Sequence, residues 1–169
     1  KFGEEMTIET EALSYNRLFC YRRFTIYDEA GNVVYQVRGR MPWLRRQMTI
    51  LDAKTGTALA TVTQAMWRLF FQRLTISIGG QAVATIQERF SILSTRLSIQ
   101  GLGWTVDGIS WLKGCSLYDA DGEIIATIRS KIMTWSDTFE IEIYDETIHP
   151  VLVLAVVLGI DTVRDSAEN

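Results

Sequence analysis

The sequence has little of the chemistry that metal sites and many active sites require. Its 169 residues include one histidine, His149, and two cysteines, Cys20 and Cys115. A structural zinc site needs about four such ligands, and a serine- or cysteine-based triad needs a histidine between its partners. Two isolated cysteines also make no disulfide framework. We therefore expect no metal, no cofactor, no catalytic residue and a reducing, cytoplasmic setting.

No hydrophobic run is long enough to span a membrane. The longest, over residues 148–160, has 13 residues, whereas a membrane-spanning helix needs about 20. It is apolar on every side from Val151 to Ile160, which is typical of a helix enclosed on every side. Pro150 suits an early helical position. The sequence predicts a buried helix over about 148–163, followed by an acidic tail over 164–169.

Other familiar signatures are missing as well. The first residues, KFGEEMTIETEA, are acidic and do not resemble a secretory signal. The glycines of GLGWTVDG (101–108) lack the strand-then-helix context of a phosphate-binding loop. Glu140 and Glu142 alternate along one strand face, where solvated surface is the expected environment. The sequence therefore predicts a protein that is not an enzyme.

Charge is unevenly distributed along the chain. The net charge is −3, but residues 12–118 carry 13 Lys/Arg against 5 Asp/Glu, and residues 119–169 carry 3 against 11. Such asymmetry indicates either a surface for an anionic partner or two halves that attract each other. The pI of about 5.2 and the lack of a binding motif argue against nucleic acid.

A hairpin pattern repeats along most of the chain. Alternating apolar runs surround glycine-containing turns in FTIYDEAGNVVYQV, MTILDAKTGTALATV, LTISIGGQAVATI and CSLYDADGEIIATI. Leu97 and Phe139 begin two related units. Alternation predicts strands with one buried face, and Gly, Asn and Asp suit tight hairpins. We expect a single domain over 1–169, with the strand repeats over about 12–145.

The second arms of these hairpins present small residues to the predicted interior. Alternation places these residues inside: Val33, Tyr35, Val37, Ala58, Ala60, Val62, Ala82, Ala84, Ile86, Ile124, Ala126 and Ile128. A barrel of about twelve strands has an interior that side chains alone do not fill. The sequence therefore predicts a mainly β fold, a closed antiparallel barrel of about twelve strands around the hydrophobic C-terminal helix.

The combination of these units with GLGW (Gly101–Trp104), WSDTFEIEI (Trp135–Ile143) and VLVLAVVLGID resembles the LURP-one-related family. That family belongs to the tubby C-terminal-like superfamily, together with phospholipid scramblases. The resemblance runs from about Tyr15 to Val163 and implies a twelve-stranded barrel around a central helix. Tubby proteins bind phosphoinositides and scramblases associate with membranes, but none of their ligand-binding residues is matched to a position in this sequence. The palmitoylated cysteine tract of the scramblases is absent here.

The connections at one end of the predicted barrel are basic and aromatic. GRMPWLRRQ (39–47), AMWRLFFQR (65–73), RFSILSTR (89–96) and KIMTWSD (131–137) alternate with the polar glycine turns. Candidate anion-binding residues are Arg22, Arg38, Arg40, Arg45, Arg46 and Arg89. Candidate rim residues for a membrane or partner are Trp43, Trp67, Phe70, Phe71 and Trp135. Arginine pairs with phosphate, and aromatic side chains enter the headgroup region.

These observations lead to two hypotheses about function. The first is a binding domain that associates peripherally with anionic phospholipid membranes through this rim. The alternative is a protein-interaction or self-association scaffold that uses the same rim, since apolar surface with arginine also suits protein interfaces. A structural explanation is that the loops only cap the barrel mouth.

Overall fold

The computed structural model describes residues 4–12, 22–40, 45–65, 73–87, 96–108, 114–131 and 138–167. Within these residues the chain forms strands and one helix. They are β1 (Glu4–Ala12), β2 (Arg22–Asp28), β3 (Val33–Arg40), β4 (Arg45–Asp52), β5 (Ala58–Ala65), β6 (Arg73–Ile78), β7 (Gln81–Gln87), β8 (Arg96–Gln100), β9 (Trp104–Asp107), β10 (Cys115–Tyr118), β11 (Ile124–Lys131), β12 (Thr138–Ile143) and α1 (Pro150–Ala167).

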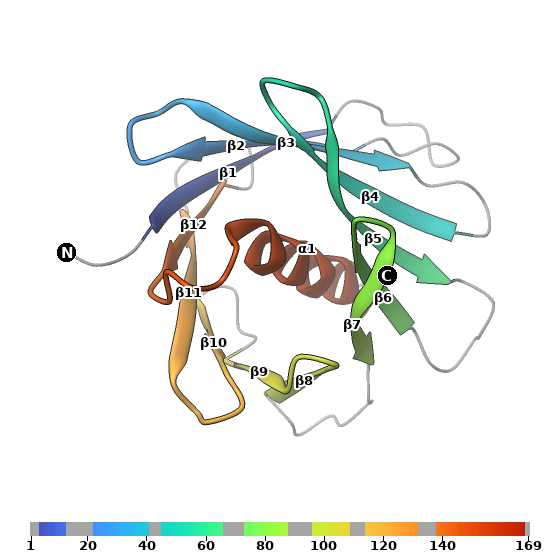
Figure 1. The fold of residues 1–169 in the computed structure, drawn as a ribbon, viewed down its shortest axis with the longest axis vertical. Coiled ribbons are helices and arrows are strands. Elements are labelled where there is room, and N and C mark those ends of the chain that lie inside the picture. The colour runs from blue at the N-terminus through green and yellow to red at the C-terminus, as the bar shows by residue number, and fades with distance from the viewer. Residues whose placement is uncertain are drawn as a thin grey trace.

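The described strands close into one antiparallel barrel with α1 inside it (Figure 1). Each strand pairs with its sequence neighbours, and β1 joins β12 to β2 to complete the ring. Closure leaves no unpaired strand edge. The predicted architecture, a mainly β closed barrel around a C-terminal helix, is confirmed.

The closing strand β1 lies ahead of the region where we expected the strand repeats to begin. Met6 and Ile8 alternate with Glu5, Thr7 and Glu9 along it, and both apolar side chains are buried. The sequence pattern that predicts this strand is short, with only two large apolar residues among several glutamates, and is therefore easily missed. Its role depends on pairing with β12, which is more than a hundred residues away in the sequence.

The hairpin register corrects one prediction about the inner faces. The first inward residue predicted in each second arm is exposed instead: Val33, Ala58, Ala82 and Ile124. The cause is a bulge beside each turn. In the β2–β3 hairpin, for example, Ile26 pairs with Tyr35 but Tyr27 pairs with Val33. The extra residue contacts the core in their place, and the four such residues are Val34, Leu59, Val83 and Ile125.

The bulges also connect successive hairpins. The carbonyl of Val34 accepts a hydrogen bond from the backbone N–H of Ala53 at 3.1 Å. The carbonyl of Ile125 accepts one from Tyr144 at 2.8 Å. At the Val83 bulge the neighbour is Gly101, where an added Cβ would lie 2.6 Å from the Val83 carbonyl oxygen. Gly101 also has a φ of +93°, so the first glycine of GLGW is required for two reasons.

The helix occupies the barrel interior. Val153, Leu154, Ala155 and Val156 are fully buried on successive positions, so every side of α1 contacts the wall. Its centre also lies close to the wall at Gly159, where an added Cβ would come within 2.6 Å of the Ile86 side chain. Helix hydrogen bonding begins as predicted near Pro150, and the Val151 N–H donates to His149 Nδ1 at 3.2 Å. The histidine therefore caps the helix.

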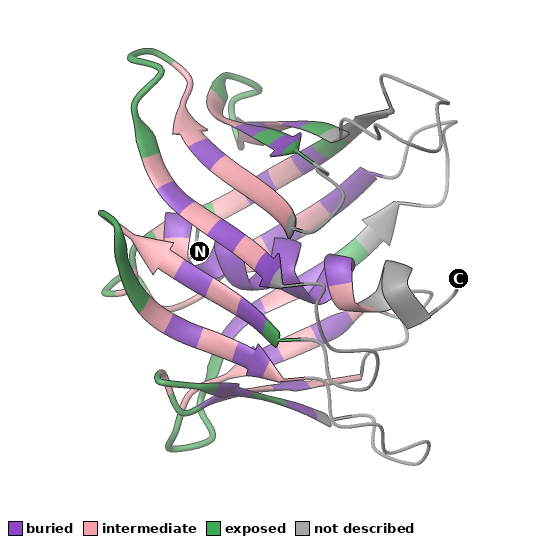
Figure 2. Ribbon diagram, turned by 90° about the vertical axis from the view of Figure 1, so that its right-hand side faces the viewer, coloured by how far each residue is buried: buried purple, intermediate pink, exposed green. Residues whose placement is uncertain are grey.

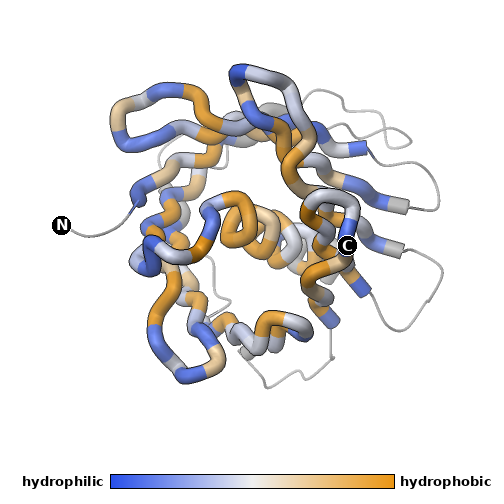
Figure 3. Tube along the Cα trace, viewed as in Figure 1, coloured by the Kyte–Doolittle hydropathy of each residue, from blue (hydrophilic) through white to orange (hydrophobic). Residues whose placement is uncertain are grey.

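The core is the space between the strands and this helix. Apolar residues alternate along each strand and continue through α1 in Figure 3. Figure 2 shows the same alternation as bands of buried and partly buried residues, with exposed residues concentrated in the hairpin turns. Burying apolar surface stabilises a fold by about 25 cal/mol per Å² removed from water, so this shared core is the main source of stability.

Candidate functional site

The up-and-down topology gives the barrel two different ends. At the turn end lie the hairpin turns between β2 and β3, β4 and β5, β6 and β7, β8 and β9, and β10 and β11. At the loop end lie the strand termini Arg40 and Arg45, Ala65 and Arg73, Gln87 and Arg96, and Lys131 and Thr138. The predicted basic and aromatic segments are attached to the loop end. Arg89, Trp43, Trp67, Phe70, Phe71 and Trp135 themselves lie outside the described residues.

Exposed arginines lie together near the loop end on β2 and β3. Arg38 and Arg40 are both exposed, as expected. Arg23, which sequence reasoning missed, is also exposed and pairs directly with Arg38 across the two strands. We call Arg23, Arg38 and Arg40 the basic strip. Arg73, at the start of β6, adds another exposed cation at the same end.

The Arg23–Arg38 pair places like charges opposite each other. Such a pair costs about 0.2–1 kcal/mol relative to neutral residues. The other strand neighbour of Arg38 is Thr49, which cannot neutralise it. Arg23 faces Glu11 on β1, but the structure does not describe the Glu11 side chain. Closely spaced cations at the surface attract anionic partners.

The other predicted arginines are placed differently. Arg46 lies on the same face of β4 as the buried Ile50, and its Nε atom is buried. It pairs across β4 and β5 with Gln64, which is only 3% exposed. Arg46 therefore belongs to the inner wall of the barrel and not to the basic strip. Arg22 and Arg45 begin β2 and β4 at the loop end, but their side chains are not described.

The turn end carries the opposite charge. Four aspartates lie at this end: Asp28 and Asp52 are the last residues of β2 and β4, Asp119 follows β10, and Asp145 lies between β12 and α1. Each carboxylate accepts backbone N–H bonds from the turn that follows it. Asp52 Oδ1, for example, accepts from the N–H groups of Lys54 at 2.9 Å and Thr55 at 2.8 Å. Glu29, Asp121, Glu123 and Glu146 are exposed nearby.

Hydrogen bonds favour the charged form of three of these carboxylates. The side chain and backbone of Asn32 lower the pKa of Asp28, and those of Thr55 lower the pKa of Asp52. The side chain and backbone of Thr147 lower the pKa of Asp145 in the same way. The barrel therefore has a basic loop end and an acidic turn end, a separation that the uneven charge along the sequence does not by itself reveal.

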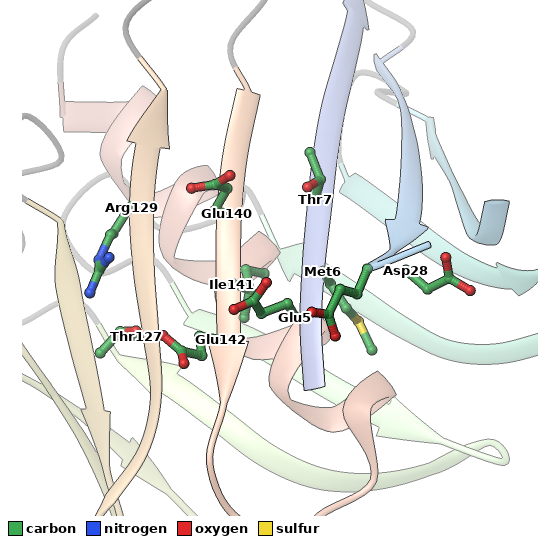
Figure 4. A pocket seen from close by; sticks show the side chains of 10 residues that line it. Glu5, Met6, Thr7, Asp28, Thr127, Arg129, Glu140, Ile141 and Glu142 are labelled. Carbon is green, nitrogen blue, oxygen red and sulfur yellow. The ribbon is translucent and has the colours of Figure 1, made fainter. Parts of the chain in front are cut away.

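A hollow of about 310 Å³ lies on the outer wall near the turn end (Figure 4). We call it the acidic hollow. It is lined by Glu5, Met6, Thr7, Asp28, Glu29, Thr127, Arg129, Glu140, Ile141 and Glu142. Glu5 and Glu142 pair directly across β1 and β12, and Arg129 pairs with Glu140 across β11 and β12. Glu142 Oε2 accepts a hydrogen bond from the Tyr144 hydroxyl at 2.8 Å.

No observation on the described residues indicates catalysis. No group of three or more His, Cys, Asp or Glu in this part of the chain could hold a metal ion. Burial raises the pKa of Cys115 to about 12, so its thiol stays protonated and unreactive at neutral pH. The search of the described helices finds none that could cross a membrane.

Comparison with known proteins agrees with this geometry. Residues 5–161 match the family model of LURP-one-related proteins, which spans nearly the whole barrel and most of α1. The chain belongs to this family. It is also similar to the uncharacterized protein YxjI of Bacillus subtilis, with 26% identity over 155 residues, covering 90% of this chain and 94% of that protein. No solved structure matches significantly. The family resemblance predicted from GLGW and the terminal helix is confirmed.

Proposed function

We propose that this LURP-one-related barrel is a peripheral binding protein for anionic phospholipid surfaces, with its loop end toward the membrane. The observation that supports this most strongly is the separation of charge between the ends of the barrel. Arg23, Arg38, Arg40 and Arg73 are exposed near the loop end, while the aspartates of the hairpin turns lie at the other. An anionic surface attracts the first group and repels the second.

The magnitude is sufficient for reversible association. Each arginine near an anionic bilayer contributes about 1 kcal/mol, so the four exposed arginines supply about 4 kcal/mol. The aromatic side chains predicted for the rim, Trp43, Trp67 and Trp135 among them, would add interfacial insertion. Acids at the turn end do not cancel this attraction, because the Debye length at physiological salt, about 8 Å, is short compared with the length of a strand. The bound barrel therefore contacts the membrane with its loop end.

Vesicle co-sedimentation tests this proposal. The protein is mixed with vesicles of neutral lipid alone or of neutral and anionic lipid, at low and at high salt. We expect binding only to the anionic vesicles, with steep loss of binding as salt rises. A double variant, Arg23→Gln with Arg38→Gln, should bind at least about tenfold more weakly, since two contributions of about 1 kcal/mol are lost. Equal binding to neutral vesicles, or none to anionic ones, would refute the proposal.

A second candidate function is association with a protein partner. The acidic hollow favours it, because anionic lipid would not occupy a surface lined by Glu5, Asp28 and Glu142. The same molecule therefore carries one surface suited to an anionic partner and another suited to a cationic one.

A further inference from the structure

The acidic hollow and the basic strip lie on one continuous part of the barrel wall. The hollow is formed mainly by β12, β1 and the turn that follows β2, and the strip is carried by β2 and β3. Because β12, β1, β2 and β3 are consecutive neighbours in the ring, both surfaces face the same side of the molecule. They are displaced along the barrel axis, since Glu5 and Glu142 lie near the turn end and Arg38 and Arg40 near the loop end.

The centre of each surface is a cross-strand pair of like charges, and the two pairs have opposite sign. Arg23 pairs with Arg38, and Glu5 pairs with Glu142. Between them the wall presents the half-buried, uncharged Thr7, Thr25 and Tyr27, together with one exposed carboxylate, Glu9, which pairs with Thr25. Bringing the arginine pair of one copy against the glutamate pair of another would allow charge-assisted, bidentate contacts. Figure 4 shows the side chains of Glu5, Glu140 and Glu142 among those that line the hollow.

We infer that this wall is a dimer interface and that its occupant is a second copy of the chain. A two-fold axis perpendicular to the line from strip to hollow places each basic strip opposite the acidic hollow of the other copy. The two barrels then lie side by side with their axes antiparallel. Such an isologous contact uses the same patch on both subunits and closes at two, as most soluble homo-oligomers do. Complementary charge at each half of the patch fixes the register.

The inferred dimer has a consequence for the proposed function. The strip that would meet anionic lipid is covered in the dimer, so dimerisation and membrane binding compete for Arg23 and Arg38. Only this competition rests on the proposed function. The dimer itself is measured without lipid, so either idea can fail without the other.

Sedimentation velocity over a range of protein concentrations tests the dimer. At low salt we expect a monomer–dimer equilibrium with no larger species. Raising the salt from about 0.01 M to about 1 M shortens the Debye length from about 30 Å to about 3 Å and should dissociate the dimer. A protein that stays monomeric at low salt, or forms oligomers that keep growing with concentration, would overturn the inference.

Charge reversal identifies the surface. One variant carries Glu5→Lys and Glu142→Lys, and the other carries Arg23→Glu and Arg38→Glu. Each alone should be monomeric, because its strip and hollow then have the same sign. Mixed in equal amounts, the two should form a heterodimer, because both halves of the patch become complementary again. Failure of the mixed variants to associate, with each shown to be folded by circular dichroism, would exclude this interface.

Milder variants cover the possibility that the reversals unfold the barrel. Glu142→Gln should weaken the dimer at least about tenfold, the effect of losing one charge-assisted contact of about 1.5 kcal/mol. The control is Glu123→Gln, which removes the same charge from an exposed turn residue outside the wall and should leave the dimer unchanged. Equal effects of both substitutions would show that net charge, and not this surface, governs association.

Discussion

Two alanines in β7 provide a strict test of the hairpin register. Ala82 and Ala84 are two residues apart, so simple alternation places both on the inner face of the barrel. In the structure Ala84 is 4% exposed, whereas Ala82 is exposed, because the bulge at Val83 shifts the register between them. Substituting aspartate at each position therefore distinguishes the bulged barrel from a regular one.

The expected cost at Ala84 follows from its burial. An aspartate enclosed there would have its pKa raised by about 3–5 units, since a buried carboxyl is neutral unless it is paired. Keeping it neutral at pH 7 costs about 4 kcal/mol, because pH 7 lies about 3 units above its unfolded pKa and each unit is worth about 1.36 kcal/mol. That is a large part of the stability of a typical domain, about 5–15 kcal/mol. Ala82→Asp should change stability by less than about 0.5 kcal/mol, as exposed substitutions usually do.

Thermal unfolding followed by circular dichroism measures both effects. For a chain of this length 1 kcal/mol corresponds to about 2–4 °C, so Ala84→Asp should lower the midpoint by about 8–16 °C or prevent folding. Ala82→Asp should unfold with the parent protein. Equal destabilisation by the two substitutions would refute the bulge. A stable Ala84→Asp variant would refute the enclosed interior altogether.

Three further predictions address the turns and the buried thiol. Gly101→Ala should lower the free energy of unfolding in urea by more than Gly31→Ala. Alanine at the positive φ of either position costs about 1–3 kcal/mol, but only at Gly101 would its Cβ also meet the Val83 carbonyl oxygen. Hydrogen bonds from Thr55 lower the pKa of Asp52 in the folded state. Its stabilising contribution is therefore complete above its unfolded pKa and disappears as the pH falls through the folded pKa. In Asp52→Asn the free energy of unfolding should depend less on pH below about pH 4 than in the parent protein. Cys115 should resist iodoacetamide at pH 8 in the native protein and react in urea, as measured by peptide mass spectrometry.

The sequence was sufficient for the architecture because two strong patterns agreed. Phe24 and Ile26, the alternating apolar residues at the start of FTIYDEAGNVVYQV, are buried, as expected of a strand with one buried face. The apolar run around Ala155 correctly predicted an enclosed helix. Small inner residues such as Ala84 then required something bulky inside the barrel, which the helix supplies. Each pattern alone is ambiguous, but together they allow few arrangements.

The bulges could not be predicted from the same pattern. Val33 and Val34 are both apolar, as are Ile124 and Ile125, so hydrophobicity does not say which one faces inward. The choice depends on how the chain leaves its turn and on the neighbouring hairpin, whose Ala53 N–H bonds to the Val34 carbonyl. The choice is therefore made by contacts between hairpins, which the local sequence pattern does not show.

The charge separation between the barrel ends, in contrast, had a signal in the sequence. Asp28, Asp52 and Asp119 occupy the same position in their repeats, directly before the glycine turn. Because the sequence predicts the glycine turns at one end of the barrel, this shared position already implies that the carboxylates lie together. The exposed position of Arg23 could also have been predicted, because Arg23 is adjacent to Phe24, whose side chain faces inward. The inward position of Arg46 required the register between β4 and β5.

The most direct test of the account is a matched pair of charge reversals, each measured for binding to anionic vesicles. Arg38→Glu changes an exposed residue of the basic strip, and Lys54→Glu changes an exposed residue of the turn end. Both alter the net charge equally. If the loop end meets the membrane, Arg38→Glu should weaken binding at least about tenfold, since it loses one attraction of about 1 kcal/mol and adds a repulsion, whereas Lys54→Glu should bind as the parent does. Equal losses from both substitutions would contradict an oriented, loop-end interaction.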